Sequence, residues 1–379
     1  MNYRNALLVF ALTGLIACTH AARKTADDVV KGKVKQLLIE AHESGNFSGS
    51  IAVSHNDSLV LAHQLGLANR VWNIPVSAET RFDIASLNKS FVAGLIMLAV
   101  EEGKINLEDK FVDVLQMPYS GKFDSTITIH HMLTHTSGLP DYDAIPEELR
   151  QNGFARFKRM HFKNPDYVDF ISRLKPVATP GTRFYYSNFA YHLLSILLED
   201  IYDSSFNALL QEKICVPLEL VNTFNSIDNE AVFEHVAEGY LYDENSNEWK
   251  SNSFIDLTLG RRIFSTSLDL QKWGMAMTNN RLFRAESRQI MHKNHLAELT
   301  GDLSYGYGWV VYQKGESFKM GDLEIDMPYI IHGGETEGYK SMLVVINNGE
   351  WVISILANSG NKTNEMELIK RIVTLLNTD

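Results

Sequence analysis

The hydrophobic positions near the N-terminus form two different patterns. In the segment 25–45, apolar residues recur at helical spacing and Gly45 offers a stop, which predicts an amphipathic helix whose buried face is Val30, Val34, Leu37, Leu38 and Ala41. The next stretch, "SGSIAVSHNDSLVLAHQLG", is rich in β-branched and other apolar residues on both sides of Asn56-Asp57. This pattern predicts two strands joined by a tight turn.

The C-terminal third of the chain also has a strand pattern. Three apolar stretches, "YGYGWVVYQ", "YKSMLVVINN" and "EWVISILANS", predict strands, and Asn348-Gly349 predicts a tight turn between the last two. A final helix is predicted in "NEMELIKRIVTLL", whereas the region between Ser86 and Arg262 is mostly helical and loop-rich. We therefore expect an α/β (α+β) fold in which both chain ends build one antiparallel sheet flanked by helices. The expected domains are an α/β domain, 25–85 plus 263–379, and a mostly helical inserted domain, 86–262.

One helix of the expected insertion combines a long apolar run with two reactive side chains. In "FDIASLNKSFVAGLIMLAV", only Gly94 interrupts the apolar residues from Phe91 to Val100, and the run is too short to span a bilayer. Ser86 and Lys89 share one face of its first turn. Burying a lysine is costly, and a desolvated lysine can lose its proton. The pair predicts a serine nucleophile beside a base, with chance spacing on a surface helix as the alternative.

Two further motifs lie where loops meet regular elements. Tyr186-Ser187-Asn188 precedes an apolar helix, where a tyrosine hydroxyl can shuttle a proton and Asn188 can bind a substrate carbonyl. His332-Gly333-Gly334 follows an apolar strand, and paired glycines let a ligand lie close to a strand backbone. The alternatives are aromatic packing at a helix start and a simple turn that contains a histidine.

Neither a metal nor a cofactor is expected. His131 and His135 have the i, i+4 spacing of a helical metal site and His130 is adjacent, but the sequence between them lacks the glutamate of a His-Glu-x-x-His motif. The chain also has no Gly-x-Ser-x-Gly elbow of the kind found in α/β-hydrolases.

The N-terminus has the features of an export signal. Arg4 precedes an apolar stretch from Ala6 to Ala17, which predicts a signal peptide over residues 1–17. Leu15-Ile16-Ala17-Cys18 resembles the lipobox of bacterial lipoproteins, which implies a lipid on Cys18 and a location on a bacterial envelope membrane, on its periplasmic or outer-surface side. A transmembrane anchor is the alternative, but the apolar stretch is short for one. The second cysteine, Cys215, has apolar neighbours and is interpreted as a packing residue.

The composition narrows the range of partners. Of the 379 residues, 45% are hydrophobic and 21% charged, as in ordinary globular proteins, and the formal net charge is −11. Such a charge argues against a nucleic acid as partner. It leaves the oligomeric state open.

Taken together, the three motifs resemble those of the penicillin-recognising serine hydrolases: class C β-lactamases, D-alanyl-D-alanine carboxypeptidases, D-aminopeptidases and related esterases. The segments "TITIHHMLTHTSGLPDY", "RRIFSTSLDLQKWGMAM" and "YGYGWVV" are also similar to segments of this family, so the resemblance covers about residues 30–375. It implies the β-lactamase/transpeptidase-like fold.

The resemblance also implies roles for individual residues. Ser86 would form an acyl-enzyme, Lys89 and Tyr186 would transfer its proton, and Asn188 would hold a substrate amide or bond to Lys89. His332, Gly333 and Gly334 would line the substrate site, and the backbone N–H groups of Ser86 and Glu335 would form the oxyanion hole.

The third motif departs from the Lys-Thr-Gly of class C β-lactamases. A histidine is mostly neutral at pH 7 at its ordinary pKa, so His332 is a poor anchor for a substrate carboxylate. This favours a peptidase, amidase or esterase over an efficient β-lactamase, and peptidoglycan-derived fragments are a reasonable substrate class. The alternative is a penicillin-binding sensor or binding lipoprotein with little turnover.

Overall fold

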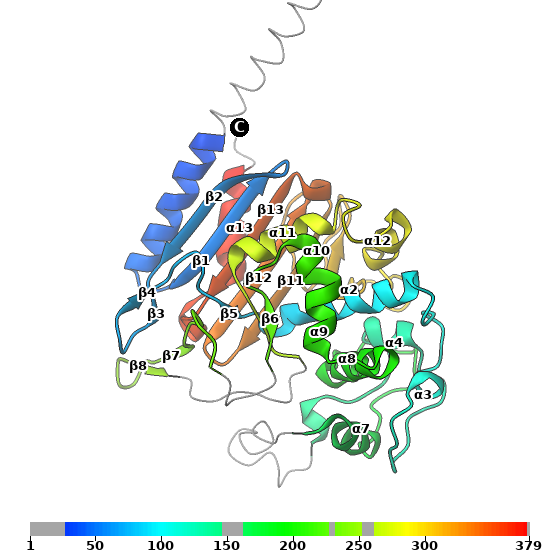
Figure 1. The fold of residues 1–379 in the computed structure, drawn as a ribbon. Helices are drawn as coiled ribbons and strands as arrows, with labels where there is room; N and C mark the ends of the chain where they lie inside the picture. The colour runs from blue at the N-terminus through cyan, green and yellow to red at the C-terminus, as the bar shows by residue number, and fades with distance from the viewer. Residues whose placement is uncertain (1–26, 146–161, 227–231, 252–260, 377–379) are drawn as a thin grey trace, which may run out of the picture.

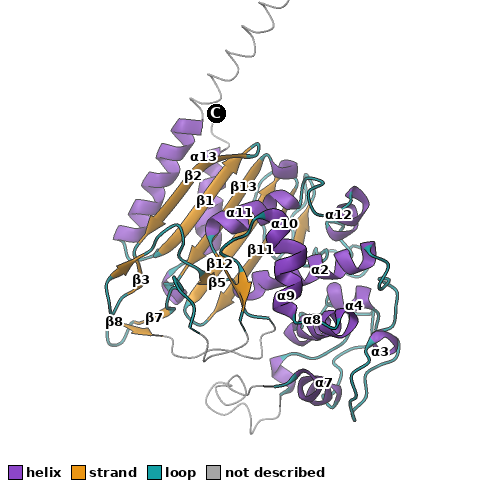
Figure 2. Cartoon of the chain, viewed as in Figure 1, coloured by secondary structure: helices purple, strands orange, loops and turns teal. Residues whose placement is uncertain are grey.

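The centre of the molecule is a six-stranded antiparallel sheet that joins both ends of the chain (Figures 1 and 2). The computed structural model describes residues 27–145, 162–226, 232–251 and 261–376. The strand order is β10-β11-β12-β13-β1-β2, and the C-terminal β13 pairs with the N-terminal β1. The expected sheet from both chain ends is therefore confirmed. Its strands are β1 (Gly49–His55), β2 (Ser58–Leu65), β10 (Val310–Tyr312), β11 (Tyr329–Thr336), β12 (Tyr339–Ile346) and β13 (Trp351–Ala357).

The two predicted tight turns are present because their residues tolerate left-handed backbone. Asn56 and Asp57 have φ of 45° and 64° and connect β1 to β2. Asn348 and Gly349 have φ of 54° and 93° and lie in η4 (Asn347–Gly349), between β12 and β13. Asparagine, aspartate and glycine are the residues that adopt such angles at low cost.

Different helices cover the two faces of the sheet. The helix over 27–43 and α13 (Glu365–Leu376) pack on one face, which we call the α13 face. On the opposite face, α11 (Ser267–Ala276) packs between the sheet and the helical region. The predicted apolar face of the first helix is confirmed, since Val30, Val34, Leu37, Leu38 and Ala41 are all buried.

The helical region between β5 and β9 surrounds α2 (Asn88–Glu101). The predicted buried helix is confirmed, because nearly every α2 side chain from Asn88 to Ala99 is buried. Among the described residues, no helix is long and apolar enough to cross a bilayer. The other helices are α3 (Phe111–Val114), α4 (Ile129–Leu133), α7 (Asn164–Ser172), α8 (Asn188–Tyr202), α9 (Phe206–Leu210), α10 (Val216–Leu218) and α12 (Ala285–Met291), with short turns η1 (Ala85–Leu87), η2 (Tyr142–Ala144), η3 (Gln211–Cys215) and η5 (Gly360–Lys362).

Short strands connect this region to the large sheet. β9 pairs with β5 on one side and β6 on the other, and the sequence analysis did not predict these two- and three-residue strands. One hydrophobic core runs from α2 and α8 past α11 to the inner face of the sheet. The division into two domains stays a prediction. The short strands are β3 (Leu67–Asn69), β4 (Ile74–Pro75), β5 (Phe82–Asp83), β6 (Phe224–Asn225), β7 (Tyr240–Asp243), β8 (Glu248–Ser251) and β9 (Ile263–Ser265).

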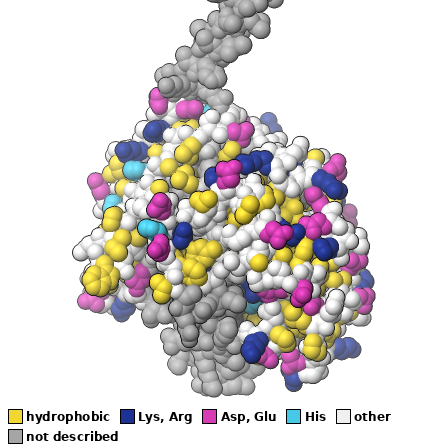
Figure 3. All heavy atoms as spheres, in the orientation of Figure 1, with side chains coloured by type: hydrophobic (Ala, Val, Ile, Leu, Met, Phe, Trp, Pro, Cys, Tyr) yellow, Lys and Arg dark blue, Asp and Glu magenta, His cyan; other side chains and the backbone are white. Residues whose placement is uncertain are grey.

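The surface mixes charges of both signs. On the face shown in Figure 3, acidic and basic side chains are interspersed, with small hydrophobic areas between them. The described part of this face therefore presents no continuous basic surface.

A glycine in α2 allows close contact with α11. The indole of Trp273 stacks on Phe91 with ring centroids 4.4 Å apart and donates a hydrogen bond to Ser90 Oγ at 3.0 Å. A Cβ on Gly94 would lie 2.8 Å from this indole. The helix that follows Ser86 is therefore fitted closely against α11 and, through it, against the sheet.

Two helix-interior glycines should respond oppositely to alanine. Gly94→Ala should lower the free energy of unfolding by about 1–3 kcal/mol through overpacking against Trp273. Gly32→Ala, in the helix over 27–43, meets nothing within 4 Å and should raise it by roughly 0.5–1 kcal/mol through helix propensity. Urea unfolding of both variants checks this, and stabilisation by both would show that α2 has room beside Trp273.

Candidate active site

Ser86 lies in a strained turn between β5 and α2. Ala85 has φ of 46°, a left-handed angle that costs a non-glycine residue of order 1–3 kcal/mol. The carboxylate of Asp83 accepts a hydrogen bond from the Ala85 N–H at 2.8 Å and pairs with Arg262 at 2.5 Å. These contacts hold the turn, and Ser86 itself lies in η1, one short turn before the helix that the sequence predicted for it.

Lys89 is the buried centre of the site. Its side chain is 1% exposed, and its Nζ donates to Ser86 Oγ at 3.2 Å and to Asn188 Oδ1 at 2.8 Å. Among the described residues, no carboxylate lies within ion-pairing distance of Nζ. The structure thus brings Ser86, Lys89 and Asn188 together, although they belong to two separate motifs in the sequence.

Asp141 fixes the orientation of Asn188. Asn188 begins α8, where Ser187 is the N-cap and accepts from the Ala190 N–H. The Asn188 Nδ2 donates to Asp141 at 3.0 Å, so Oδ1 is the atom that faces Lys89. Both ends of the amide are engaged by protein groups, which matches the predicted bond to Lys89 rather than a direct hold on substrate.

Asp141 is a site residue that the sequence analysis missed. Burial raises the pKa of its carboxyl to about 6, although Lys89 and the hydrogen bonds from Asn188 act in the opposite direction. The signal in the sequence is a carboxylate directly after "SGLP", within a stretch already quoted for its family likeness.

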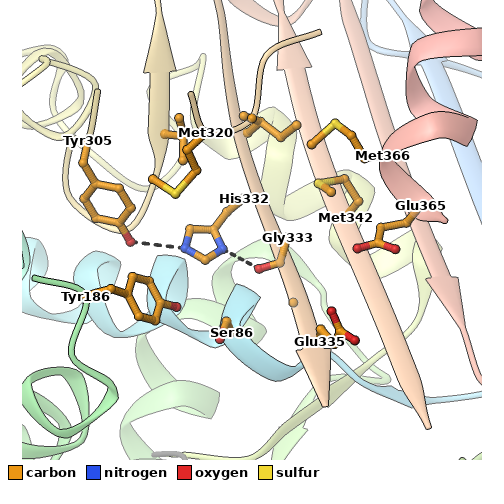
Figure 4. A pocket seen from close by; sticks show the side chains of 14 residues that line it. Ser86, Tyr186, Tyr305, Met320, His332, Gly333, Glu335, Met342, Glu365 and Met366 are labelled. Carbon is orange, nitrogen blue, oxygen red and sulfur yellow. Dashed lines mark hydrogen bonds between the residues drawn. The ribbon is translucent and has the colours of Figure 1, made fainter. Parts of the chain in front are cut away.

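Tyr186 lies beside Lys89 and rests on a buried histidine. Its ring centroid is 4.9 Å from Lys89 Nζ and 4.3 Å from the ring of His135. His135 Nδ1 accepts from the Ser187 N–H at 3.1 Å, and burial, followed by Lys89, lowers the pKa of His135 well below its usual value. A neutral imidazole therefore supports Tyr186, whose hydroxyl is directed toward Ser86 in Figure 4.

The motif His332-Gly333-Gly334 lies inside β11, whereas the sequence analysis placed it after a strand. His332 Nδ1 lies 2.7 Å from the Gly333 carbonyl oxygen and must donate to it, so Nε2 accepts from the Tyr305 hydroxyl at 3.2 Å. Burial, and secondarily the charge of Lys89, lowers the pKa of His332 to about 3. The imidazole is neutral at physiological pH. Tyr305, which orients it, was not identified as a site residue from the sequence.

The glycines let β11 lie directly against the Ser86 turn. A Cβ on Gly334 would come within 2.2 Å of the Ile84 carbonyl oxygen and 2.8 Å of the Ser86 nitrogen. Ser341, opposite Gly334 on β12, donates from its hydroxyl to the same Ile84 oxygen at 2.6 Å. Strand and turn are thus held in contact, which is the arrangement that the predicted oxyanion donors, the N–H groups of Ser86 and Glu335, require.

These residues surround a cavity of about 340 Å³ (Figure 4). Lys89 and Asn188 are not among the lining residues and lie behind Ser86. The predicted site residues on the cavity wall are Ser86, Tyr186, His332, Gly333, Gly334 and Glu335, and the others are Tyr305, Val310, Met320, Gly321, Ile331, Met342, Glu365 and Met366.

The remaining histidines and the described cysteine make contacts of their own. His130 Nδ1 lies 2.7 Å from the Tyr307 hydroxyl, and His131 closes a capping box with Thr128. No group of three His, Cys, Asp or Glu side chains suited to a metal ion occurs within the described ranges. Cys215 is buried, and burial raises the pKa of its thiol to about 12, as suits a packing residue. Cys18 lies outside the described residues.

Comparison with known proteins agrees with this arrangement. The chain is 26% identical over 350 residues to "Penicillin-binding protein 4*" of Bacillus subtilis (strain 168), covering 88% of this chain and 73% of that protein. Solved structures that share its fold include the following two. A penicillin-binding protein from Bacillus halodurans has a TM-score of 0.74, 24% identity and coverage of 89% and 98% of the two chains. A D-stereospecific amidohydrolase from Streptomyces sp. has a TM-score of 0.73, 20% identity and coverage of 90% and 97%.

A family model described as "Beta-lactamase" matches residues 27–377, which is nearly the whole chain. The match includes the Ser86 turn, the start of α8 and β11. The chain therefore belongs to the beta-lactamase family of serine hydrolases.

Proposed function

We propose that this serine hydrolase cleaves an amide or ester through an acyl-enzyme on Ser86. The observation that carries the proposal is the position of the buried Lys89 amine, 3.2 Å from Ser86 Oγ and behind the wall of the cavity. A nucleophile within hydrogen-bond reach of a base, which a third group orients, is the general arrangement of covalent catalysis. Here Asn188 is that third group, and Asp141 orients it.

The proposed reaction has two steps. Ser86 Oγ bonds to the substrate carbonyl carbon and gives its proton to Lys89, which accepts it as the neutral amine. The proton then passes through Tyr186 to the leaving amine or alcohol as the bond to that group breaks. Water then attacks the acyl ester, restores the Ser86 hydroxyl and releases a carboxylic acid. Tyr186 is suited to the transfer because its hydroxyl is directed toward Ser86 and its ring lies beside Lys89.

The negative oxygen that develops on the substrate would be bound by the backbone N–H groups of Ser86 and Glu335. The close contact of β11 with the Ser86 turn supports this role, because it fixes the two donors relative to each other before substrate arrives. Removing one such donor costs about 2.7–4 kcal/mol in other hydrolases.

The neutral His332 favours an amidase, peptidase or esterase over an efficient β-lactamase, because it offers a substrate carboxylate no charge. The Streptomyces protein that shares this fold is a D-stereospecific amidohydrolase, an enzyme of the same reaction class. We further propose peptidoglycan-derived fragments as the substrates available to an exported enzyme.

A lipid on Cys18 would place the enzyme on the envelope membrane. The wild-type chain expressed in a bacterium should enter the detergent phase of a Triton X-114 extraction, and Cys18→Ser should move to the aqueous phase, because several acyl chains anchor a protein stably whereas none would remain. Cys215→Ser is the matched control and should partition as the wild type does. Detergent-phase recovery of Cys18→Ser would refute lipidation at this residue.

The nucleophile can be tested by mass spectrometry. Residues 19–379, mixed with benzylpenicillin or 4-nitrophenyl acetate, should gain the mass of one acyl group, and Ser86→Ala should gain none and lose at least about 10³-fold in kcat/KM for the ester. Ser172→Ala is the control, since Ser172, the last residue of α7, and Lys175 beyond it have the same spacing but lie outside the cavity. Equal acylation of Ser86→Ala would disprove the assignment. A penicillin adduct that persists for hours would favour the sensor alternative.

The dependence of kcat/KM on pH tests the role of the Asp141 carboxylate. Both of its carboxylate oxygens accept hydrogen bonds from Asn188, one from the backbone N–H and one from Nδ2, and protonation would turn one of these acceptors into a donor. The kcat/KM of the wild type should therefore fall as the pH drops through about 6. Asp141→Asn should be less active at pH 8 and lack this acidic limb, because residue 141 no longer titrates. Asp143→Asn is the neighbouring control and should keep the limb. An unchanged profile in Asp141→Asn would assign the limb to another group.

A further inference from the structure

The cavity continues past Ser86 to the other side of the sheet. Ser86 precedes α2, whose side chains belong to the core on the α11 side. Ile331 and Met342 belong instead to the core on the α13 face, and Met366 packs against that same core. All of these residues line one cavity, and Figure 4 shows Met342 and Met366 across β11 from Ser86.

The cavity can extend across the sheet edge because β11 here has no partner strand on one side and carries two glycines. β10 pairs with β11 only as far as Ile331, so the following residues form a free strand edge. Gly333 and Gly334 have no side chains that would close it, and a Cβ on Gly333 would come within 2.9 Å of Met342 Cε. A ligand bound at Ser86 can therefore extend over this edge.

The wall beyond the edge is apolar and adaptable. Three methionines, one from the loop before β11, one from β12 and one from α13, form it with two branched side chains. Thioether side chains adjust to the shape of a ligand more readily than branched ones. We call this part of the cavity the methionine branch: Met320, Met342, Met366, Val310 and Ile331.

The charges beside the methionine branch are acidic. Glu335 and Glu365 line the cavity and share Lys340, at 2.6 Å and 3.7 Å. Among the described residues, no lysine or arginine lines the cavity, and His332 is neutral. Burial and the nearby Glu335 raise the pKa of Glu365, while Lys340 opposes them. A carboxylate on the part of a ligand that lies in the methionine branch would therefore meet negative charge, whereas Lys89 lies at the Ser86 end of the cavity.

We propose that the methionine branch binds an extended apolar arm of the substrate that carries no carboxylate. This rests on the proposed function, because the reacting end of the same substrate would lie at Ser86. The substrate class is then an amide or ester with an alkyl-like arm that is uncharged or cationic, which narrows the proposed peptidoglycan-derived fragments to those that carry such an arm.

Ligand binding to the Ser86→Ala variant, which cannot form an acyl-enzyme, tests the methionine branch independently of the proposed catalytic function. Ser86→Ala is titrated with butan-1-ol, hexan-1-ol, hexylamine and hexanoate, with affinities measured by ligand-observed NMR. Hexan-1-ol should bind about sixteenfold more tightly than butan-1-ol, at about fourfold per methylene. Hexylamine should bind at least as tightly as hexan-1-ol, and hexanoate at least about tenfold more weakly. Equal binding of the two alcohols, or hexanoate binding as tightly as hexan-1-ol, would overturn the proposal.

Variants locate the binding within the cavity. In the Ser86→Ala background, Met366→Trp should fill the branch and weaken hexan-1-ol binding about tenfold or more, and Met366→Gln should weaken it without added bulk. Met327→Gln is the control, since Met327 packs against the same core but does not line the cavity. Glu365→Gln should strengthen hexanoate binding, whereas Glu367→Gln, exposed on the same helix, should not. Wild-type affinities in both Met366 variants would place the alcohol elsewhere and refute the proposal.

Discussion

The burial of one amine organises this site. Lys89 is 1% exposed, and an amine in such surroundings is tolerated only if its hydrogen-bonding capacity is used. Ser86 and Asn188 supply two partners, and Asp141 holds Asn188 in the orientation that presents its oxygen. Three segments distant in sequence must therefore come together before the lysine can be accommodated. The fold of the helical region around α2 and α8 meets this requirement.

The second constraint is the absence of side chains at two consecutive positions of β11, Gly333 and Gly334. Gly334 lets the strand touch the Ser86 turn, and Gly333 leaves the strand edge open between two halves of the cavity. The same strand carries His332, which burial keeps neutral. The strand β11 thus supplies a candidate oxyanion donor and leaves the passage open. At the position of His332 it offers a substrate carboxylate no positive charge. Proteins of one fold differ in substrate through such choices on a shared scaffold.

Much of the site was predictable because its reactive residues lie at the starts of apolar elements. Lys89 and Asn188 lie in the first turns of α2 and α8, and Ser86 and Tyr186 lie two residues before these helices, where the local pattern marks a helix start. Residues that act on other residues were missed. Asp141 matters through Asn188, 47 positions away, as Tyr305 and the methionines do through β11. No local pattern identifies a residue whose role depends on a partner elsewhere in the chain.

The sequence by itself determined the features that depend on neighbouring residues: the Asn56-Asp57 hairpin, the apolar face of the first helix and the serine-lysine spacing. Backbone preference and hydrophobic periodicity are enough for these. Only the tertiary structure decided the pairing of β13 with β1, the contact of Gly334 with the Ser86 turn, the burial that lowers the pKa of His332 and the continuity of the cavity. Each of these results from burial or from contact between distant segments, and both exist only once the chain has folded.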